Sequence, residues 1–187
     1  MTMTANGLAK LNEEIGELLK ETGKKLAYFR STLHPDGAGP LNERIGREIA
    51  DLEAAMDFVV LSFGLNVGYV ERRTQAQLTQ YRVACKLSAR TGGIARLQGN
   101  MGTLLIHSSA LVEGFDSSSL SDAGQDYGSL TMAIADVKAS LAYVKSHFDL
   151  NETEIEARRG VKLALFIRWS EDETNGTDSF HCESAEA

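Results

Sequence analysis

Residues 7–19 read GLAKLNEEIGELL, and residues 93–105 read GIARLQGNMGTLL, so one pattern occurs twice in the chain. Six of the thirteen aligned positions are identical, and most of the others exchange similar side chains. In both copies apolar residues recur at the three- and four-residue spacing of an amphipathic helix. These stretches therefore predict a helix and, at the same time, an internal repeat.

The repeat continues along the chain in a nearly constant register. Residues 49–51 match 134–136, residues 63–66 match 148–151, and residues 70–73 match 155–158. Because the register persists across separate segments, we predict a tandem duplication of a three-helix unit of about 85 residues. The predicted domains are residues 1–90, residues 91–170 and a disordered acidic tail at residues 171–187.

The rest of the first half supports an all-α fold. Apolar periodicity predicts helices over about residues 8–29, over residues 41–63 and from about residue 67 onward. Gly64 is a plausible left-handed C-cap of the second helix. Both prolines fall in the predicted loop at residues 31–40. Long helices with so few prolines, together with the repeat, favour a helical-bundle pseudo-dimer.

Composition narrows the classes of function. The formal net charge of −7 over 187 residues argues against a nucleic-acid binder, because neutralising phosphates requires a basic surface. No apolar run approaches the roughly 18 residues that span a bilayer, and residues 1–7 lack a signal-peptide pattern. We therefore expect a cytoplasmic protein without a membrane partner. Cys85 and Cys182 lack metal-type spacing and are expected to be free thiols.

Five acids lie in two short motifs on the first two predicted helices: Glu13, Glu14 and Glu17, then Glu48 and Asp51. Positions i and i+3 share a helix face, so Glu14 projects with Glu17, and Glu48 projects with Asp51. Antiparallel packing would gather four carboxylates beside an apolar stripe, which is unfavourable without a counter-charge. Mg²⁺ or Mn²⁺ would supply that charge, since both prefer hard oxygen ligands.

The pattern E-E-x-x-E, a spacer and E-x-x-D resembles the signature of the all-α nucleotide pyrophosphatase superfamily. That superfamily includes MazG proteins, dimeric dUTPase-like enzymes and phosphoribosyl-ATP pyrophosphatases. The resemblance covers residues 7–63 and continues more weakly through the repeat. It is greatest to small MazG-like proteins of phage genomes, including the loop that begins at His34. The spacer of 30 residues is slightly longer than is usual in MazG proteins.

The resemblance implies magnesium-dependent hydrolysis, with manganese as a substitute, of a nucleoside triphosphate to the monophosphate and pyrophosphate. It implies metal ligands at Glu14, Glu17, Glu48 and Asp51. Glu13 or Glu17 would then orient or deprotonate the attacking water. The preferred base and sugar stay open, with GTP or dGTP, dUTP and dCTP as candidates.

The second half keeps only part of the acidic pattern. Neutral residues replace the four glutamates, namely Gly99, Asn100, Thr103 and Ala133. Only the aspartate persists, as Asp136. We therefore predict that the second half has no metal site of its own.

Cations lie on the third predicted helix of each half. In the superfamily a Lys and an Arg of this helix contact substrate phosphates, often across a subunit interface. The resemblance thus implies that Lys162, with Arg158 or Arg159, binds the triphosphate, whereas Arg72 and Arg73 are competing candidates. A solvated helix face is the alternative interpretation of these side chains.

Two aromatic residues and two alternatives to an enzyme complete the expectations. His34 is a candidate for lining a base pocket, and Trp169 is expected to pack in the core rather than stack on a base. The chain could also be a catalytically inactive nucleotide-binding or interaction module, or a helical scaffold with solvated acids. Because single-copy relatives pair two short chains, we expect a homodimer of pseudo-dimeric chains.

Overall fold

The computed structural model describes residues 5–28, 30–34, 36–37, 39–84, 89–116 and 123–178. Over these residues the chain is all-helical, with one isolated β-bridge between Leu33 and Pro40 and no strand, which confirms the all-α part of the prediction. The helices are α1 (Ala5–Ala27), α2 (Leu41–Ser62), α3 (Val67–Ala84), α4 (Ala89–Asp116), α5 (Ala123–Phe148) and α6 (Glu152–Asp178). None of them is both long and apolar enough to cross a membrane.

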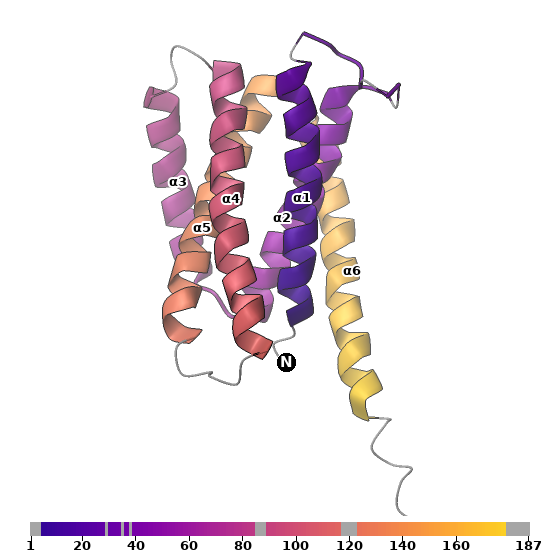
Figure 1. The fold of residues 1–187 in the computed structure, drawn as a ribbon, viewed down its shortest axis with the longest axis vertical. Coiled ribbons are helices and arrows are strands. Elements are labelled where there is room, and N and C mark those ends of the chain that lie inside the picture. Colours follow the sequence, from indigo (N-terminus) through magenta and orange to yellow (C-terminus); the bar gives the residue numbers. More distant parts are fainter. Residues whose placement is uncertain are drawn as a thin grey trace, which may run out of the picture.

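Four helices form the centre of the molecule, and α3 and α6 lie on opposite flanks (Figure 1). In the centre α1 packs on α2 and α4, and α5 packs on α4 and α2. Each flanking helix packs on the other half of the chain, α6 on α2 and α3 on α5. The last turns of α6 extend past the ends of the other helices (Figure 1).

The apolar pattern explains this packing. On α1 the periodic residues Leu8, Leu11, Ile15 and Leu18 are fully buried. Helix α2 buries 14 of its 22 residues. Helix α2 contacts α1, α5 and α6, so its apolar residues must lie on more than one face of the helix. The first two helices therefore contribute to the main core, and Glu14 and Asp51 are buried with it.

The helix ends agree with the sequence except at the C-terminus. Gly64 has φ of 60°, and the N–H of Leu65 donates to the carbonyl of Val60, as in a Schellman C-cap. Helix α6 continues to Asp178, so residues 171–178 of the expected tail are helical, and residues 179–187 lie outside the described residues. Cys85 and Cys182 also lie outside them.

One ion pair occurs twice, at aligned positions of the two halves. Asp51 on α2 accepts two hydrogen bonds from the guanidinium of Arg158 on α6, at 2.7 and 2.5 Å. Asp136 on α5, which aligns with Asp51, accepts two from Arg73 on α3, at 2.8 and 2.8 Å. Since Arg73 and Arg158 are also aligned positions of the sequence, the two ion pairs follow the same register.

Other local features recur in the same way. Left-handed backbone follows both second helices, with φ of 60° at Gly64 and 51° at Asp149. The side chains of Asn66 and Asn151 accept hydrogen bonds from backbone N–H groups at the starts of α3 and α6. Further aligned contacts join Asn12 to Ser108 and Gln98 to Thr22, and place Gly7 against Phe58 and Gly93 against Tyr143.

Candidate metal centre

Three glutamates converge between α1 and α2. One carboxylate oxygen from each of Glu14, Glu17 and Glu48 lies within 4.8 Å of the others. Glu14 and Glu17 are one turn apart on α1 and share a face, and Glu48 meets them from α2. Over the described ranges no other group of three His, Cys, Asp or Glu side chains converges in this way. We call these three residues the acidic group.

The acidic group opens from the core toward solvent. Glu14 is 1% exposed, Glu48 is half-buried and Glu17 is exposed. The gradient arises because the acids flank the buried stripe of α1 rather than oppose it, with Ile15 fully buried between Glu14 and Glu17. A ligand can thus reach the acidic group from the side of Glu17, while Glu14 lies at the buried end of the group.

Glu14 is a buried acid without a hydrogen bond. Neither of its carboxylate oxygens has a hydrogen-bond partner. The ammonium of Lys10 lies 3.0 Å from Oε1, but off the direction of a hydrogen bond. Burial raises the pKa of Glu14, and the charge of Lys10 opposes that rise only in part. Lys10 pairs with Oε1 alone, so Oε2 is a buried acceptor without a hydrogen bond, and a cation bound to the carboxylate would remove the cost of burying it.

The pKa of Glu48 shows how strongly burial and the neighbouring charges act in the acidic group. Burial, followed by the charges of Glu17 and Asp51, raises the pKa of Glu48 to about 7. Three carboxylates so close together do not all stay ionised at neutral pH without a counter-charge. A divalent cation among their oxygens would restore the ionised form, and an all-oxygen donor set suits Mg²⁺ or Mn²⁺.

Asp51, the fourth expected ligand, faces cations from α6. It is held by Arg158 through both oxygens, and the ammonium of Lys162 lies 3.1 Å from Oδ2. Lys162 also lies 4.0 Å from Oε1 of Glu14. The structure thus brings two of the expected phosphate-binding cations to the acids of the other half. Asp51 itself is outside the acidic group.

Three of the other expected residues lie elsewhere. Glu13 is exposed and pairs with Lys10 at 2.8 Å. Arg159 turns toward Asp57 at 2.6 Å, on the face of α2 away from the acidic group, and Arg73 binds Asp136 in the second half. The structure does not bring these three side chains to the acidic group.

His34 belongs to a separate buried cluster in the link between α1 and α2. Its Nε2 lies 3.1 Å from Glu21 Oε2 and 2.7 Å from Lys24 Nζ, and its Nδ1 contacts Asp36. These contacts fasten the loop to α1. They give His34 a structural role and no contact with the acidic group.

Two features of the site were missed from the sequence. Lys10 was not singled out, although its position one turn before Glu14 on a predicted helix was a usable signal. Trp169 was expected in the core, which is wrong, because 48% of its surface is exposed. Its side chain lies at the edge of a cavity that is also lined by the start of α1 and by Phe58 of α2, and it contacts Phe166 with ring centroids 5.9 Å apart.

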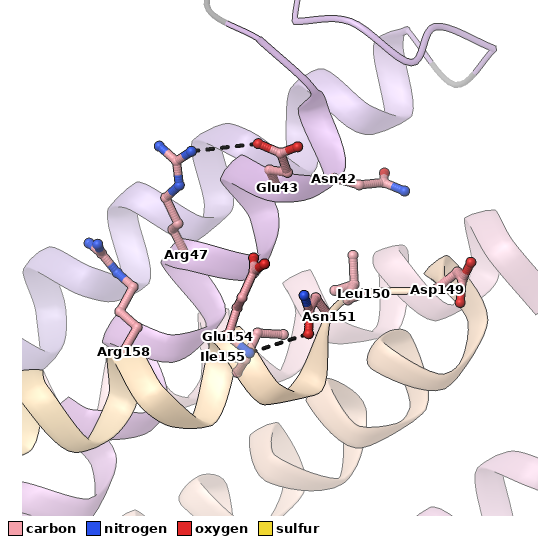
Figure 2. Close-up of a pocket in the computed structure, with 10 residues that line it drawn as sticks. Asn42, Glu43, Arg47, Asp149, Leu150, Asn151, Glu154, Ile155 and Arg158 are labelled. Atoms are coloured by element: carbon pink, nitrogen blue, oxygen red, sulfur yellow. Dashed lines mark hydrogen bonds and ion pairs between the residues drawn. The ribbon is translucent and has the colours of Figure 1, made fainter.

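A polar cavity of about 220 Å³ adjoins the acids at the start of α6, between the first turns of α2 and α6 (Figure 2). Arg47 and Arg158 line it and extend toward the same side in Figure 2, while Glu43 pairs with Arg47 at 3.7 Å. Arg158, which also binds Asp51, is the residue that this cavity shares with the site.

The corresponding place in the second half is filled by neutral hydrogen bonds. The amide of Asn100, at the position of Glu14, donates to the Tyr81 hydroxyl at 3.0 Å and to Ser140 at 2.7 Å. Asp136 is paired with Arg73. Within the described residues no group of three acids converges at this place.

The arrangement suits an anionic, metal-bound ligand: carboxylates to hold a divalent ion stand next to a lysine and an arginine that could bind its phosphates. In comparisons with protein-family models, curated proteins and solved structures, nothing matches this chain.

Proposed function

We propose that this chain is a MazG-like, divalent-metal-dependent nucleoside triphosphate pyrophosphohydrolase. The observation that carries the proposal is Glu14, a fully buried carboxylate whose two oxygens lack hydrogen bonds and which faces Glu17 and Glu48 within 4.8 Å. Its counter-charges are the ammonium groups of Lys10 at 3.0 Å and Lys162 at 4.0 Å, and a divalent cation held by all three glutamates would balance the charges of Glu17 and Glu48 as well. Lys162 and Arg158 beside it favour a phosphate-bearing substrate over a metal alone.

In the proposed site Glu14, Glu17 and Glu48 hold Mg²⁺ or Mn²⁺, with Asp51 as a further ligand once substrate draws its two cations away. When bound, the metal would neutralise phosphate charge and make a nearby water more acidic. Lys162 and Arg158 would bind the phosphates. Of the two acids expected to activate water, Glu17 lies in the group whereas Glu13 pairs with Lys10, so we assign that role to Glu17.

The proposed reaction is attack of water on the α-phosphorus. The water oxygen bonds to that phosphorus, the bond to the oxygen bridging toward the β-phosphorus breaks, and pyrophosphate leaves. The water proton passes to a carboxylate of the site. The products are a nucleoside monophosphate and pyrophosphate.

The same proposal includes a duplicated origin, in which one chain forms a pseudo-dimer. It is supported by the exchanged ion pairs of Asp51 with Arg158 and Asp136 with Arg73, and by the left-handed residues Gly64 and Asp149. The acids then come from one half and the phosphate-binding cations from the other. Pairing of two such chains into a homodimer remains a prediction.

The test is a panel of canonical and modified ribo- and deoxyribonucleoside triphosphates with Mg²⁺ or Mn²⁺, in which pyrophosphate and orthophosphate are measured separately. We expect pyrophosphate from a subset of substrates. Glu14→Gln should lower the rate about 100-fold or more, since a catalytic metal supplies several kcal/mol. Glu13→Gln, a neighbouring exposed acid, serves as the control and should keep most activity. Orthophosphate as the first product would exclude attack at the α-phosphorus.

Lys162→Ala separates phosphate binding from metal binding. We expect the variant to raise KM for the triphosphate while the Mg²⁺-dependent rise in melting temperature stays near that of the wild type, because Lys162 is not a metal ligand. Loss of the metal-dependent rise in this variant would contradict the assigned division of roles.

The second candidate is an inactive nucleotide-binding or interaction module. It is favoured by one observation, the full pairing of Asp51 with Arg158 and Lys162, which withholds a ligand from the metal and cations from the phosphates. A nucleotide-dependent rise in melting temperature without release of either phosphate product would favour this candidate.

A further inference from the structure

We propose that a second cavity, beside the acidic group, receives the base of the nucleotide, with Trp169 as the side chain on which the base stacks. This cavity lies between the start of α1, Phe58 near the end of α2 and residues 166–170 of α6. The inference rests on the proposed function, because it takes the acidic group as the place of the phosphates. It adds the part of the substrate that the acids do not recognise.

The cavity has the walls of a site for a flat aromatic group. Phe58, Phe166 and Trp169 line it, with ring centroids 6.1 Å apart for the first two and 5.9 Å for the last two. Asn6 and Glu13 add polar atoms at its boundary. Its volume of about 270 Å³ is just below the roughly 300–1,000 Å³ of pockets that enclose whole drug-sized ligands. A base fits this space better than an entire nucleotide does.

Its position relative to the acids matches the layout of a nucleotide. Lys10 lines the cavity and also lies 3.0 Å from Glu14 Oε1, so the two sites share a boundary residue. Along α6, Lys162 is followed by Phe166 one turn later and by Trp169, which is about 10 Å from Lys162 at 1.5 Å per residue. That separation is comparable with the length of a sugar and its attached base. Phosphates at Lys162 therefore place the base near Trp169.

The second half indicates which of the aromatic residues are part of the shared framework. Tyr143 and Tyr81 occupy the positions aligned with Phe58 and Phe166, and their rings are 6.4 Å apart. All four rings are buried, at 3–6% exposure. Since this pair occurs in the half that has no acidic group, core packing is enough to explain it.

Trp169 is different, because its aligned position in the first half is Ala84. The tryptophan is thus found beside the acidic group and is replaced by a small residue at the other end of the molecule. Its indole is half-exposed next to the cavity, although burial of so large an apolar surface would be favourable. Stacking with a nucleobase would cover that surface and contribute affinity without requiring one particular base.

The test uses the fluorescence of Trp169, which is the single tryptophan of the chain. The full-length protein with Mg²⁺ is titrated with adenosine 5′-monophosphate and, in parallel, with ribose 5-phosphate, which has the same phosphate and sugar but no base. We expect a saturable change in Trp169 emission with the nucleotide and none with the sugar phosphate. Unchanged emission with the nucleotide, or equal changes with both probes, would overturn the proposal.

Variants make the assignment specific to the side chain. Trp169→Ala should weaken adenosine 5′-monophosphate binding, measured by calorimetry, by about five- to 150-fold, the range for loss of one base–aromatic stack. Trp169→Phe should restore much of the affinity because it keeps an aromatic face. Val161→Ala, which shortens another exposed apolar residue of α6 (72% exposed), is the control and should bind as the wild type does. Equal affinities for Trp169→Ala and wild type would overturn the proposal.

The two proposals fail separately. Emission changes without pyrophosphate release from any triphosphate would leave the base cavity standing and remove the hydrolase. Pyrophosphate release with KM unchanged in Trp169→Ala would leave the hydrolase standing and remove the base cavity.

Discussion

At the scale of single residues, the acidic group combines charges that repel one another with a position that water reaches poorly. Glu14 and Glu48 both have raised pKa values, and burial is the main cause in each. Because both pKa values are raised, the folded state without a bound cation keeps these protons at pH values at which the unfolded chain has already released them. The stability of the metal-free protein should therefore decrease as the pH rises and these two groups lose their protons.

Glu48→Gln should remove the part of this pH dependence of stability that comes from Glu48. The pKa of Glu48 is raised from 4.5 to about 7, so the folded state binds more protons than the unfolded state between these values and stability falls as pH rises through that window. In metal-free buffer we expect the melting temperature of Glu48→Gln to exceed that of the wild type by a margin that widens from about pH 5 to about pH 8.

Glu43→Gln, an exposed acid on the same helix, should show no such widening. Saturating Mg²⁺ should reverse the order, because the cation stabilises only the chain that keeps its ligand. A margin that stays constant across this pH range would contradict the position of Glu48 in a coupled acidic group.

At the scale of elements, the ends of α2 and α5 are matched turns built from different residues. Gly64 has φ of 60° and Asp149 has φ of 51°, so the chain leaves both helices through left-handed backbone. Glycine adopts this conformation without cost, whereas a residue with a side chain does so at roughly 1–2 kcal/mol, less for aspartate. The turn fixes the start of the next helix and, at α6, the position of Arg158.

The two turns should respond in opposite directions to substitution. Gly64→Ala should lower the free energy of unfolding by about 1–2 kcal/mol, while Asp149→Gly should leave it unchanged or raise it by less than about 1 kcal/mol. Urea unfolding monitored by circular dichroism measures both. A loss of stability in Asp149→Gly similar to that in Gly64→Ala would mean that contacts of the aspartate, rather than the backbone, fix this turn.

At the scale of the whole molecule, α6 packs on α2 and α3 packs on α5. This arrangement creates two similar ion pairs in different surroundings. Asp51 accepts from Arg158 beside the acidic group, and Asp136 accepts from Arg73 beside neutral residues. One pair stands next to the proposed chemistry and the other is structural. The Asp136–Arg73 pair can therefore serve as a control for the Asp51–Arg158 pair.

Arg158→Ala and Arg73→Ala should both lower stability, each by roughly 1–3 kcal/mol, because each leaves an aspartate without its two hydrogen bonds. Only Arg158→Ala should also raise KM for a triphosphate substrate. Thermal unfolding and steady-state kinetics on the same preparations separate the two effects. A similar KM increase in both variants would point to general loosening of the bundle and against a role for Arg158 in phosphate binding.

Local pattern determined much of this protein. The helices, the Gly64 cap and the pairing of Glu14 with Glu17 follow from periodicity within one element, which is a property of neighbouring residues. The loss of acids in the second half was also visible, because alignment within the chain needs no contact information.

Only the tertiary structure decided which distant groups meet. Arg158, Arg159 and Lys162 lie within two turns of one helix, yet one binds Asp51, one turns to Asp57 and one lies between Asp51 and Glu14. The sequence left these cations as alternatives, since the angle at which α6 crosses α2 determines their partners. It likewise misplaced Trp169, which is 48% exposed because it lies at the edge of a cavity between α1, α2 and α6 rather than between packed helices. Periodicity specifies a face of a helix, whereas packing specifies what that face meets.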